Sequence, residues 1–117
     1  YARFMVALPE CYEAGETVTI SLSAGMVTTV ASVSCTVDVE CYEIDKIGGI
    51  SADLCTTAAT TINSLTFAAK AFTITPTALT AGDVLDVRLT IAVNDGATAT
   101  AVTPTIAGID LLCDIKG

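Results

Sequence analysis

Apolar and polar residues alternate strictly along two long runs of this chain. Over residues 33–41, Val or Cys fills every second position, and Ser, Thr, Asp or Glu fills the positions between them. Over residues 84–93, Leu, Val or Ile recurs at every second position from Leu85 to Val93. Successive side chains of a strand point to opposite faces, so each run predicts a strand that turns one apolar face toward a core.

Shorter runs of the same kind predict further strands, each followed by residues that favour turns or end strands. These strands are expected over residues 3–8, 17–22 and 72–74. Pro9 and Pro76 stop the first and the third, and the second is expected to end at Ala24-Gly25.

The C-terminal part contains a strong turn signal and a final strand. Asp95-Gly96 favours a tight turn with positive φ, after which residues 98–103 are expected to pair back as a hairpin that Pro104 ends. Residues 51–70 lack a clear period and predict a long connection with one short strand. The last strand is expected to turn alternate residues inward, namely Ile109, Leu111, Cys113 and Ile115.

Seven or eight strands separated by turns predict an all-β fold. Residues 1–117 are expected to form a single-domain β-sandwich with jelly-roll or related Greek-key topology, because two apolar sheet faces are best buried against each other. The abundance of β-branched residues favours the same fold class. The chain opens at Tyr1 inside the first predicted strand, so we expect that an N-terminal segment is missing from it.

The charge of the chain argues against two classes of partner. The formal net charge is −8, from 13 acidic and 5 basic residues, and the basic residues are scattered along the sequence. Binding to nucleic acid or to an anionic membrane surface requires clustered cations, so neither partner is expected. The hydrophobic content is 52%, but polar residues interrupt every stretch before it reaches the roughly 18–20 apolar residues of a spanning helix.

The absence of His removes several kinds of chemistry at once. Ser-His-Asp and Cys-His catalysis and every His-containing metal site are excluded. The five cysteines are an odd number, and no C-x-x-C pair suggests structural zinc, so a reducing cytoplasm is the expected folding compartment. Cys35 and Cys41 share a strand face roughly 20 Å apart and cannot bridge. With Cys113, they are expected to serve as small buried hydrophobes.

Several carboxylates are candidates for calcium ligands or for the acid pair of a glycosidase. Calcium requires oxygens that converge on the ion, and a glycosidase requires two carboxylates that flank a cleft. The candidates are Asp38, Glu40, Glu43 and Asp45, and then Asp83 and Asp86. Asp38 and Glu40 are expected on an outer strand face, where solvated charge is ordinary. Tyr42 interrupts the alternation and is expected to pack at an edge or an interface. No catalytic, cofactor-binding or metal-binding residue is therefore predicted, and the Thr-, Ser- and Ala-rich outer faces suit packing against another protein.

Four phrases of the sequence resemble small virion proteins of tailed bacteriophages, especially β-sandwich capsid decoration (cement) proteins. They are F-x-V-x-L-P-E-x-Y-x-A-G over residues 4–15, V-D-V-E-x-Y over 37–42, A-G-D-V-L-D-V-R over 81–88 and L-L-x-D-I-K-G over 111–117. The resemblance implies a non-enzymatic subunit, often trimeric, that binds major capsid protein on the outer capsid surface. It also implies synthesis in the host cytoplasm and an N-terminal contact arm. The alternative is a tail-fibre or spike module that binds host-surface glycans; a hydrolase is the least favoured reading.

Overall fold

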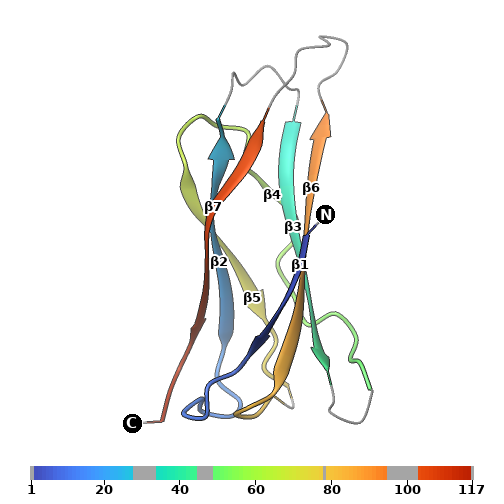
Figure 1. Cartoon of the computed structure of the whole chain (residues 1–117), viewed down its shortest axis with the longest axis vertical. Coiled ribbons are helices and arrows are strands. Elements are labelled where there is room, and N and C mark those ends of the chain that lie inside the picture. Colours follow the sequence, from blue (N-terminus) through green and yellow to red (C-terminus); the bar gives the residue numbers. More distant parts are fainter. Residues whose placement is uncertain (1, 28–33, 45–48, 78, 95–102, 117) are drawn as a thin grey trace.

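Seven strands make up the regular structure of the part of the chain that the structure describes. The computed structural model describes residues 2–27, 34–44, 49–77, 79–94 and 103–116, and within these ranges it contains no helix. The all-β prediction is therefore confirmed (Figure 1). The strands are β1 (Ala2–Ala7), β2 (Val18–Met26), β3 (Ser34–Ile44), β4 (Thr60–Thr61), β5 (Ala68–Ile74), β6 (Val84–Asn94) and β7 (Pro104–Cys113).

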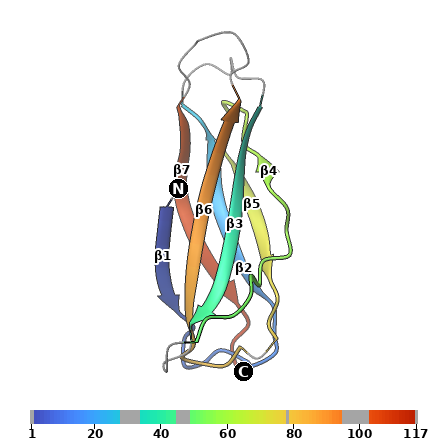
Figure 2. The same cartoon turned by 90° about the vertical axis from the view of Figure 1, so that its right-hand side faces the viewer.

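The strands form two antiparallel sheets that face each other as a β-sandwich. One sheet has the order β1-β6-β3-β4 and the other has the order β5-β2-β7. Figure 1 shows the two layers edge-on, and Figure 2 shows the four-stranded sheet in front of the three-stranded one. Most consecutive strands lie in different sheets, as do β1 and β2, β2 and β3, β5 and β6, and β6 and β7. Such crossings between layers are the Greek-key kind of connection that sandwiches use.

The core comes mainly from the strands inside the two sheets. On β2 and β3 the observed burial alternates as the sequence pattern predicts, with every second residue buried. Inward residues of both sheets form one continuous hydrophobic cluster. The largest of its fully buried side chains are Tyr12, Phe72, Leu8, Ile20, Leu22 and Met26.

Several strand boundaries differ from those expected; β5, for example, begins at Ala68 and not at residue 72. β2 continues through Ala24-Gly25 to Met26, because a strand tolerates Gly25 where another backbone approaches closely. Pro104 begins β7 instead of ending a hairpin, since the first residue of a strand needs no ladder donor. β7 pairs with β2 in the opposite sheet and not with β6, while residues 98–102 lie outside the described ranges. Ile115 follows β7 and is exposed, so its expected inward position is wrong.

Residues 51–57, called the lacing segment below, close one lateral side of the sandwich. The backbone N–H of Leu54 donates to the carbonyl of Cys41 on β3 at 2.7 Å. The carbonyl of Leu54 accepts from the backbone N–H of Thr75, which directly follows β5, at 2.8 Å. The lacing segment thus joins β3 of one sheet to the end of β5 in the other, and the long connection expected here has a structural role.

Candidate interaction surface

Among the described residues, no segment covers the lateral side opposite the lacing segment in this way. β1 ends the four-stranded sheet and β7 ends the three-stranded sheet, and each has a strand partner on one side only within the described part of the chain. Both strands lie toward the viewer in Figure 1 and on the same side in Figure 2. We call β1, β7 and residues 90–94 of β6 the open edge.

Burial differs between the two strands that end the three-stranded sheet. The inward side chains of Phe72 and Ile74 on β5 have no exposed surface, because the lacing segment lies beside them. On β7, Ile106 and Leu111 are only partly buried against the core. Ile109 pairs with the fully buried Leu22 of β2 and yet exposes 44% of its surface. The core is therefore incompletely covered at β7.

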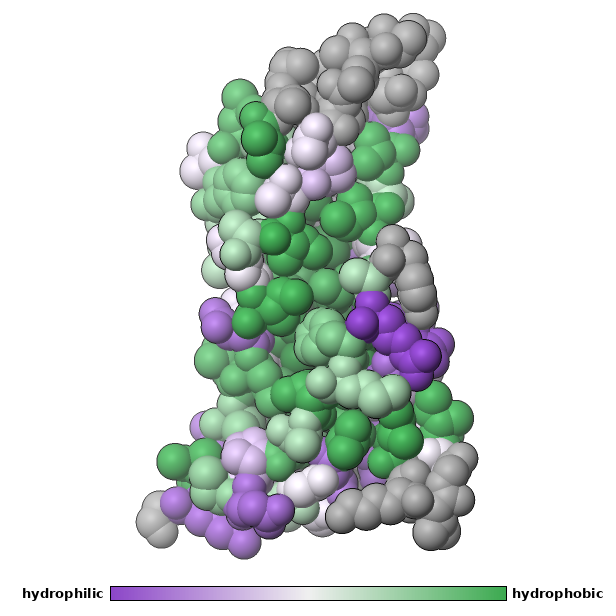
Figure 3. All heavy atoms as spheres, viewed as in Figure 1, coloured by the Kyte–Doolittle hydropathy of each residue, from purple (hydrophilic) through white to green (hydrophobic). Residues whose placement is uncertain are grey.

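In the described part of the chain, the core is also incompletely covered along the distal part of β6, residues 90–94. β1 pairs with β6 only as far as Leu89, whereas β6 continues to Asn94. Beyond that point Ile91 is partly buried and Val93, although it has inward parity, exposes 44% of its surface. Figure 3 shows apolar residues running lengthwise on this side of the molecule. Alternation identifies the inward face of a strand but not whether anything covers it, so the sequence carried no signal for this surface.

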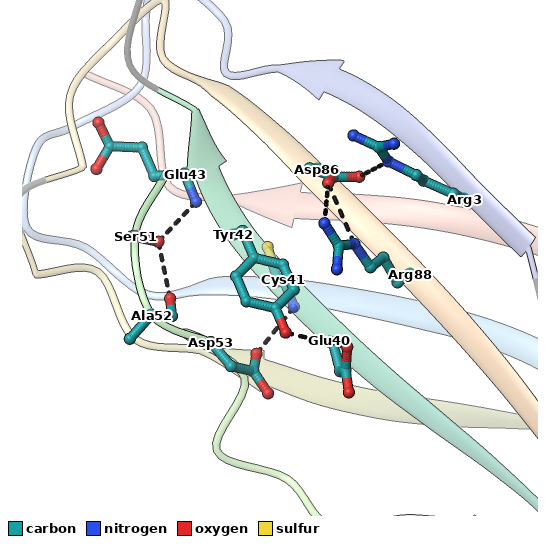
Figure 4. A network of polar contacts seen from close by, with 10 residues as sticks. All are labelled: Arg3, Glu40, Cys41, Tyr42, Glu43, Ser51, Ala52, Asp53, Asp86 and Arg88. Atoms are coloured by element: carbon teal, nitrogen blue, oxygen red, sulfur yellow. Dashed lines mark hydrogen bonds and ion pairs between the residues drawn. The ribbon is translucent and has the colours of Figure 1, made fainter. Parts of the chain in front are cut away.

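A buried carboxylate fastens β1 to the sheet. Arg3 of β1 lies directly opposite Arg88 of β6, and both guanidinium groups point to Asp86 (Figure 4). Arg3 Nε donates to Asp86 Oδ1 at 2.7 Å, and Arg88 Nη2 donates to Oδ2 at 3.0 Å. The side chain of Asp86 has no exposed surface. Its hydrogen bond from Arg3 holds the pKa of this carboxyl below its usual value near 3.8, against the opposing effect of burial and with help from Arg88.

Tyr42 extends this network onto β3. The Arg88 guanidinium lies 4.5 Å from the centroid of the Tyr42 ring, a cation–π distance. The Tyr42 hydroxyl donates to Glu40 Oε2 at 3.0 Å, and this bond is the main reason that the pKa of Tyr42 is raised. Tyr42 thus lies on the outer face of β3 opposite Asp86 and packs against the Arg88 guanidinium.

Among the described residues, the candidate carboxylates do not converge on a metal-ion position. Asp38 and Glu40 lie on the outer face of β3, as expected, and Glu43 lies near the end of the same strand. Asp83 accepts a hydrogen bond in the turn before β6. Asp45 lies outside the described ranges. Where the structure describes the chain, no three Cys, Asp or Glu side chains are placed to hold a metal ion.

The sequence pattern did not predict the network of Asp86, because Arg3 is far from Asp86 and Arg88 in the sequence. The sequence placed Asp86 among the candidate ligand carboxylates, whereas the structure pairs it with Arg3 and Arg88. Only the β1–β6 register brings Arg3 beside Arg88. Alternation did predict an outward position for each of the three residues on its own strand, and this was the signal that the sequence offered.

The cysteines behave largely as small hydrophobes. Cys35 and Cys41 are fully buried on β3 and Cys113 packs partly buried against the core, which confirms their expected inward positions. Cys11 is exposed and Cys55 is half-buried, and all five are free thiols. Burial, with smaller contributions from neighbouring acidic groups, raises the pKa of Cys41 to about 12, so it is a poor nucleophile at neutral pH.

Comparison with known proteins adds no relative. No protein-family model, no curated protein and no solved structure matches the chain. Within the described ranges, no helix has the length and apolar character that crossing a membrane would require.

Proposed function

We propose that this chain is a non-enzymatic virion structural protein, a capsid decoration (cement) protein that stabilises the shell by binding major capsid protein. The open edge is the observation that carries the proposal. Ile109 and Val93 occupy inward positions of their strands but are partly exposed, so a partner that covers them would complete the core of the sandwich. The sequence resemblance supplies the virion context.

The chemistry of the open edge supports binding to another protein. An edge strand presents unpaired backbone donors and acceptors, and natural proteins usually cover such an edge or protect it with charge. β7 carries a single charged side chain, Asp110, over its length. A strand or loop of a partner can pair with such an edge while its side chains cover the apolar residues. Location on the outer capsid surface and a homotrimeric state belong to the same proposal and rest on the resemblance.

Two measurements test the proposal together. Purified protein is mixed with capsids of its source particle that lack it, and the capsid pellet is assayed after sedimentation; a mass measurement in solution gives the oligomeric state. Saturable binding at a fixed ratio to major capsid protein, with higher thermal stability of the shell, is expected. A protein that stays in the supernatant at every concentration would overturn it.

The glycan-binding alternative is separated by a glycan array, run with and without a chelator. The proposal expects no specific sugar signal in either condition. A reproducible signal for one glycan class, in a protein that does not bind capsids, would favour the tail-fibre or spike module instead.

A further inference from the structure

Cys41 and Cys55 are brought together by one carboxylate. The backbone N–H of Cys41 on β3 donates to Asp53 Oδ1 at 2.9 Å, and the backbone N–H of Cys55 donates to the same oxygen at 3.0 Å. Because the two nitrogens share one acceptor atom, they are at most about 6 Å apart. Figure 4 shows Asp53 beside the Cys41 backbone.

Further contacts orient the two residues toward the same region. The backbone N–H of Leu54, the neighbour of Cys55, donates to the Cys41 carbonyl at 2.7 Å. The Cys41 side chain lies in the core, and Cys55 packs against that core from the lacing segment. After burial, Cys55 is the largest contributor to the raised pKa of Cys41, as Cys11 is for Cys113, so the hydrogen bonds and not the pKa distinguish this pair. The upper limit of about 6 Å between the two backbone nitrogens falls within the range of Cα separations that a disulfide requires, about 4.4–6.8 Å.

Other cysteine pairs lack this geometry. Cys35 and Cys41 lie on one continuous strand, six positions apart. Near the C-terminus, Tyr12 pairs with Ile115, and the N–H of Lys116 donates to the carbonyl of Cys11. That register places Cys11 three positions away from the residue opposite Cys113, roughly 10 Å along the strand. A bridge between Cys11 and Cys113 would require the backbone to move.

We propose that Cys41 and Cys55 form an intramolecular disulfide when the protein meets a low-molecular-weight disulfide oxidant, which fixes the lacing segment covalently to β3. In a reducing compartment the two residues remain thiols. The cross-link is a feature of the sandwich itself and does not depend on the proposed function.

The reaction is an ordinary thiol–disulfide exchange in two steps. Cys55, the more exposed thiol, loses its proton and attacks one sulfur of glutathione disulfide, which releases one glutathione thiolate and leaves a mixed disulfide on Cys55. The Cys41 thiolate then attacks Cys55 Sγ and releases the second glutathione. The protein loses two electrons and two protons, and glutathione disulfide is reduced to two glutathione thiols. Burial raises the pKa of both cysteines, so the reaction is slow at neutral pH and faster in alkali.

The test uses the full chain incubated with glutathione disulfide at about pH 8.5. Digestion with trypsin and a glutamyl endopeptidase, without reductant, separates the tripeptide Cys41–Glu43 from the peptide of residues 47–70. Mass spectrometry is expected to find these two peptides joined. The closed loop of about 15 residues is expected to raise the Tm by about 10 °C, and reductant reverses this rise.

Two serine variants make the result decisive. Cys55→Ser is expected to lose both the linked peptide and the rise in Tm. Cys11→Ser, at an exposed position, is expected to keep both. A persistent glutathione adduct on Cys55, a link between Cys11 and Cys113 in place of the proposed one, or an unchanged set of five thiols after oxidation would each overturn the proposal.

Discussion

Asp86 occupies a position that alternation along β6 assigns to the outer face, yet its side chain has no exposed surface. Its neighbours explain the difference. Arg3 and Arg88 approach from the β1–β6 ladder, and Tyr42 lies opposite it on β3, so three side chains cover the carboxylate. The shared anion also offsets repulsion between the two guanidinium groups. A residue on the outside of a sheet is therefore part of what holds β1 in register.

Replacing Asp86 with Asn tests this role. Asp86→Asn keeps the shape but removes the charge from the acceptor of both arginines. We expect the free energy of unfolding at pH 7 to fall by about 2 kcal/mol, less than for a fully buried pair because both arginines are partly exposed. Chemical denaturation measures the change. Asp110→Asn, at an exposed position on β7, is the control and should change stability by less than about 0.5 kcal/mol.

The same carboxylate predicts a pH dependence. Because the pKa of Asp86 is lower in the folded than in the unfolded chain, its stabilising contribution is present above the unfolded value near 3.8 and is lost as the pH falls through the folded pKa. The Tm of the wild type should therefore decrease more steeply than that of Asp86→Asn below about pH 4. Parallel Tm curves for the two proteins from pH 7 to pH 3 would contradict this assignment.

Gly25 and Gly108 are glycines of paired strands with opposite surroundings. A Cβ at Gly25 would lie 3.0 Å from both the Phe67 ring and the Ser64 carbonyl oxygen, whereas a Cβ at Gly108 would meet no atom within 4 Å. We expect Gly25→Ala to lower the free energy of unfolding by about 1–3 kcal/mol, because the backbone around Ser64 must move. Gly108→Ala should change it by less than about 0.5 kcal/mol. Equal effects in thermal denaturation would show that the close approach at Gly25 is unimportant.

The strands β5 and β7 differ in the backbone contacts along their outer edges. Both end the three-stranded sheet beside β2. β5 has a second set of backbone contacts, because the N–H of Thr56 donates to the carbonyl of Thr73 at 3.0 Å and Cys55 forms a bridge with Ile74. β7 pairs with β2 alone among the described strands. The lacing segment thus makes β5 resemble an interior strand, although sheet order alone classes it as an edge.

Hydrogen exchange should rank the strands accordingly. In protein diluted until it is monomeric, we expect the amides of β2 and β3 to exchange most slowly, those of β5 next, and those of β1 and β7 fastest. Mass spectrometry of peptides after deuteration measures the order. If β7 exchanges as slowly as β5 in the monomer, the open edge is covered by the chain itself.

In the whole molecule, the outer faces of the two sheets differ in chemistry, and the two lateral sides of the sandwich differ in how they are covered. The outer face of the three-stranded sheet carries small residues such as Ser21, Ser23 and Ala71, as the composition predicts. The outer face of the four-stranded sheet instead carries the charged network around Asp86. Of the two lateral sides in the described part of the chain, the open edge combines strands that have a partner on one side only with partly exposed inward residues, so the proposed partner binding belongs to that side.

A substitution at the open edge tests this assignment. Ile109→Thr keeps a β-branched residue on β7 but removes apolar surface that is already 44% exposed. We expect capsid binding to weaken at least about tenfold, while the free energy of unfolding falls by about 1 kcal/mol. Leu65→Thr, at an exposed position between β4 and β5, is the matched control and should bind as the wild type does. Co-sedimentation across a concentration series measures both variants, and equal loss in the two would contradict the assignment.

The sequence alone determined the fold class and the inward faces of the main strands. A strand has a period of two, so the alternations around Val37 and Val87 define orientation without knowledge of any neighbour. The inward positions of Cys35 and Cys41 followed for the same reason. The lack of His likewise excluded every catalytic site of this chain that requires an imidazole.

Tertiary structure decided which strands are neighbours and what lies beside the last strand of each sheet. Alternation contains no information about pairing, so neither the contact between Arg3 and Asp86 nor the pairing of β7 with β2 could be predicted. The lacing segment has no period, because its backbone bonds first to β3 of one sheet and then, from Leu54 onward, to β5 of the other and the residue after it. The open edge could not be predicted from the sequence for the same physical reason. The direction of a side chain is a local property of the strand, whereas its burial depends on segments far away in the chain.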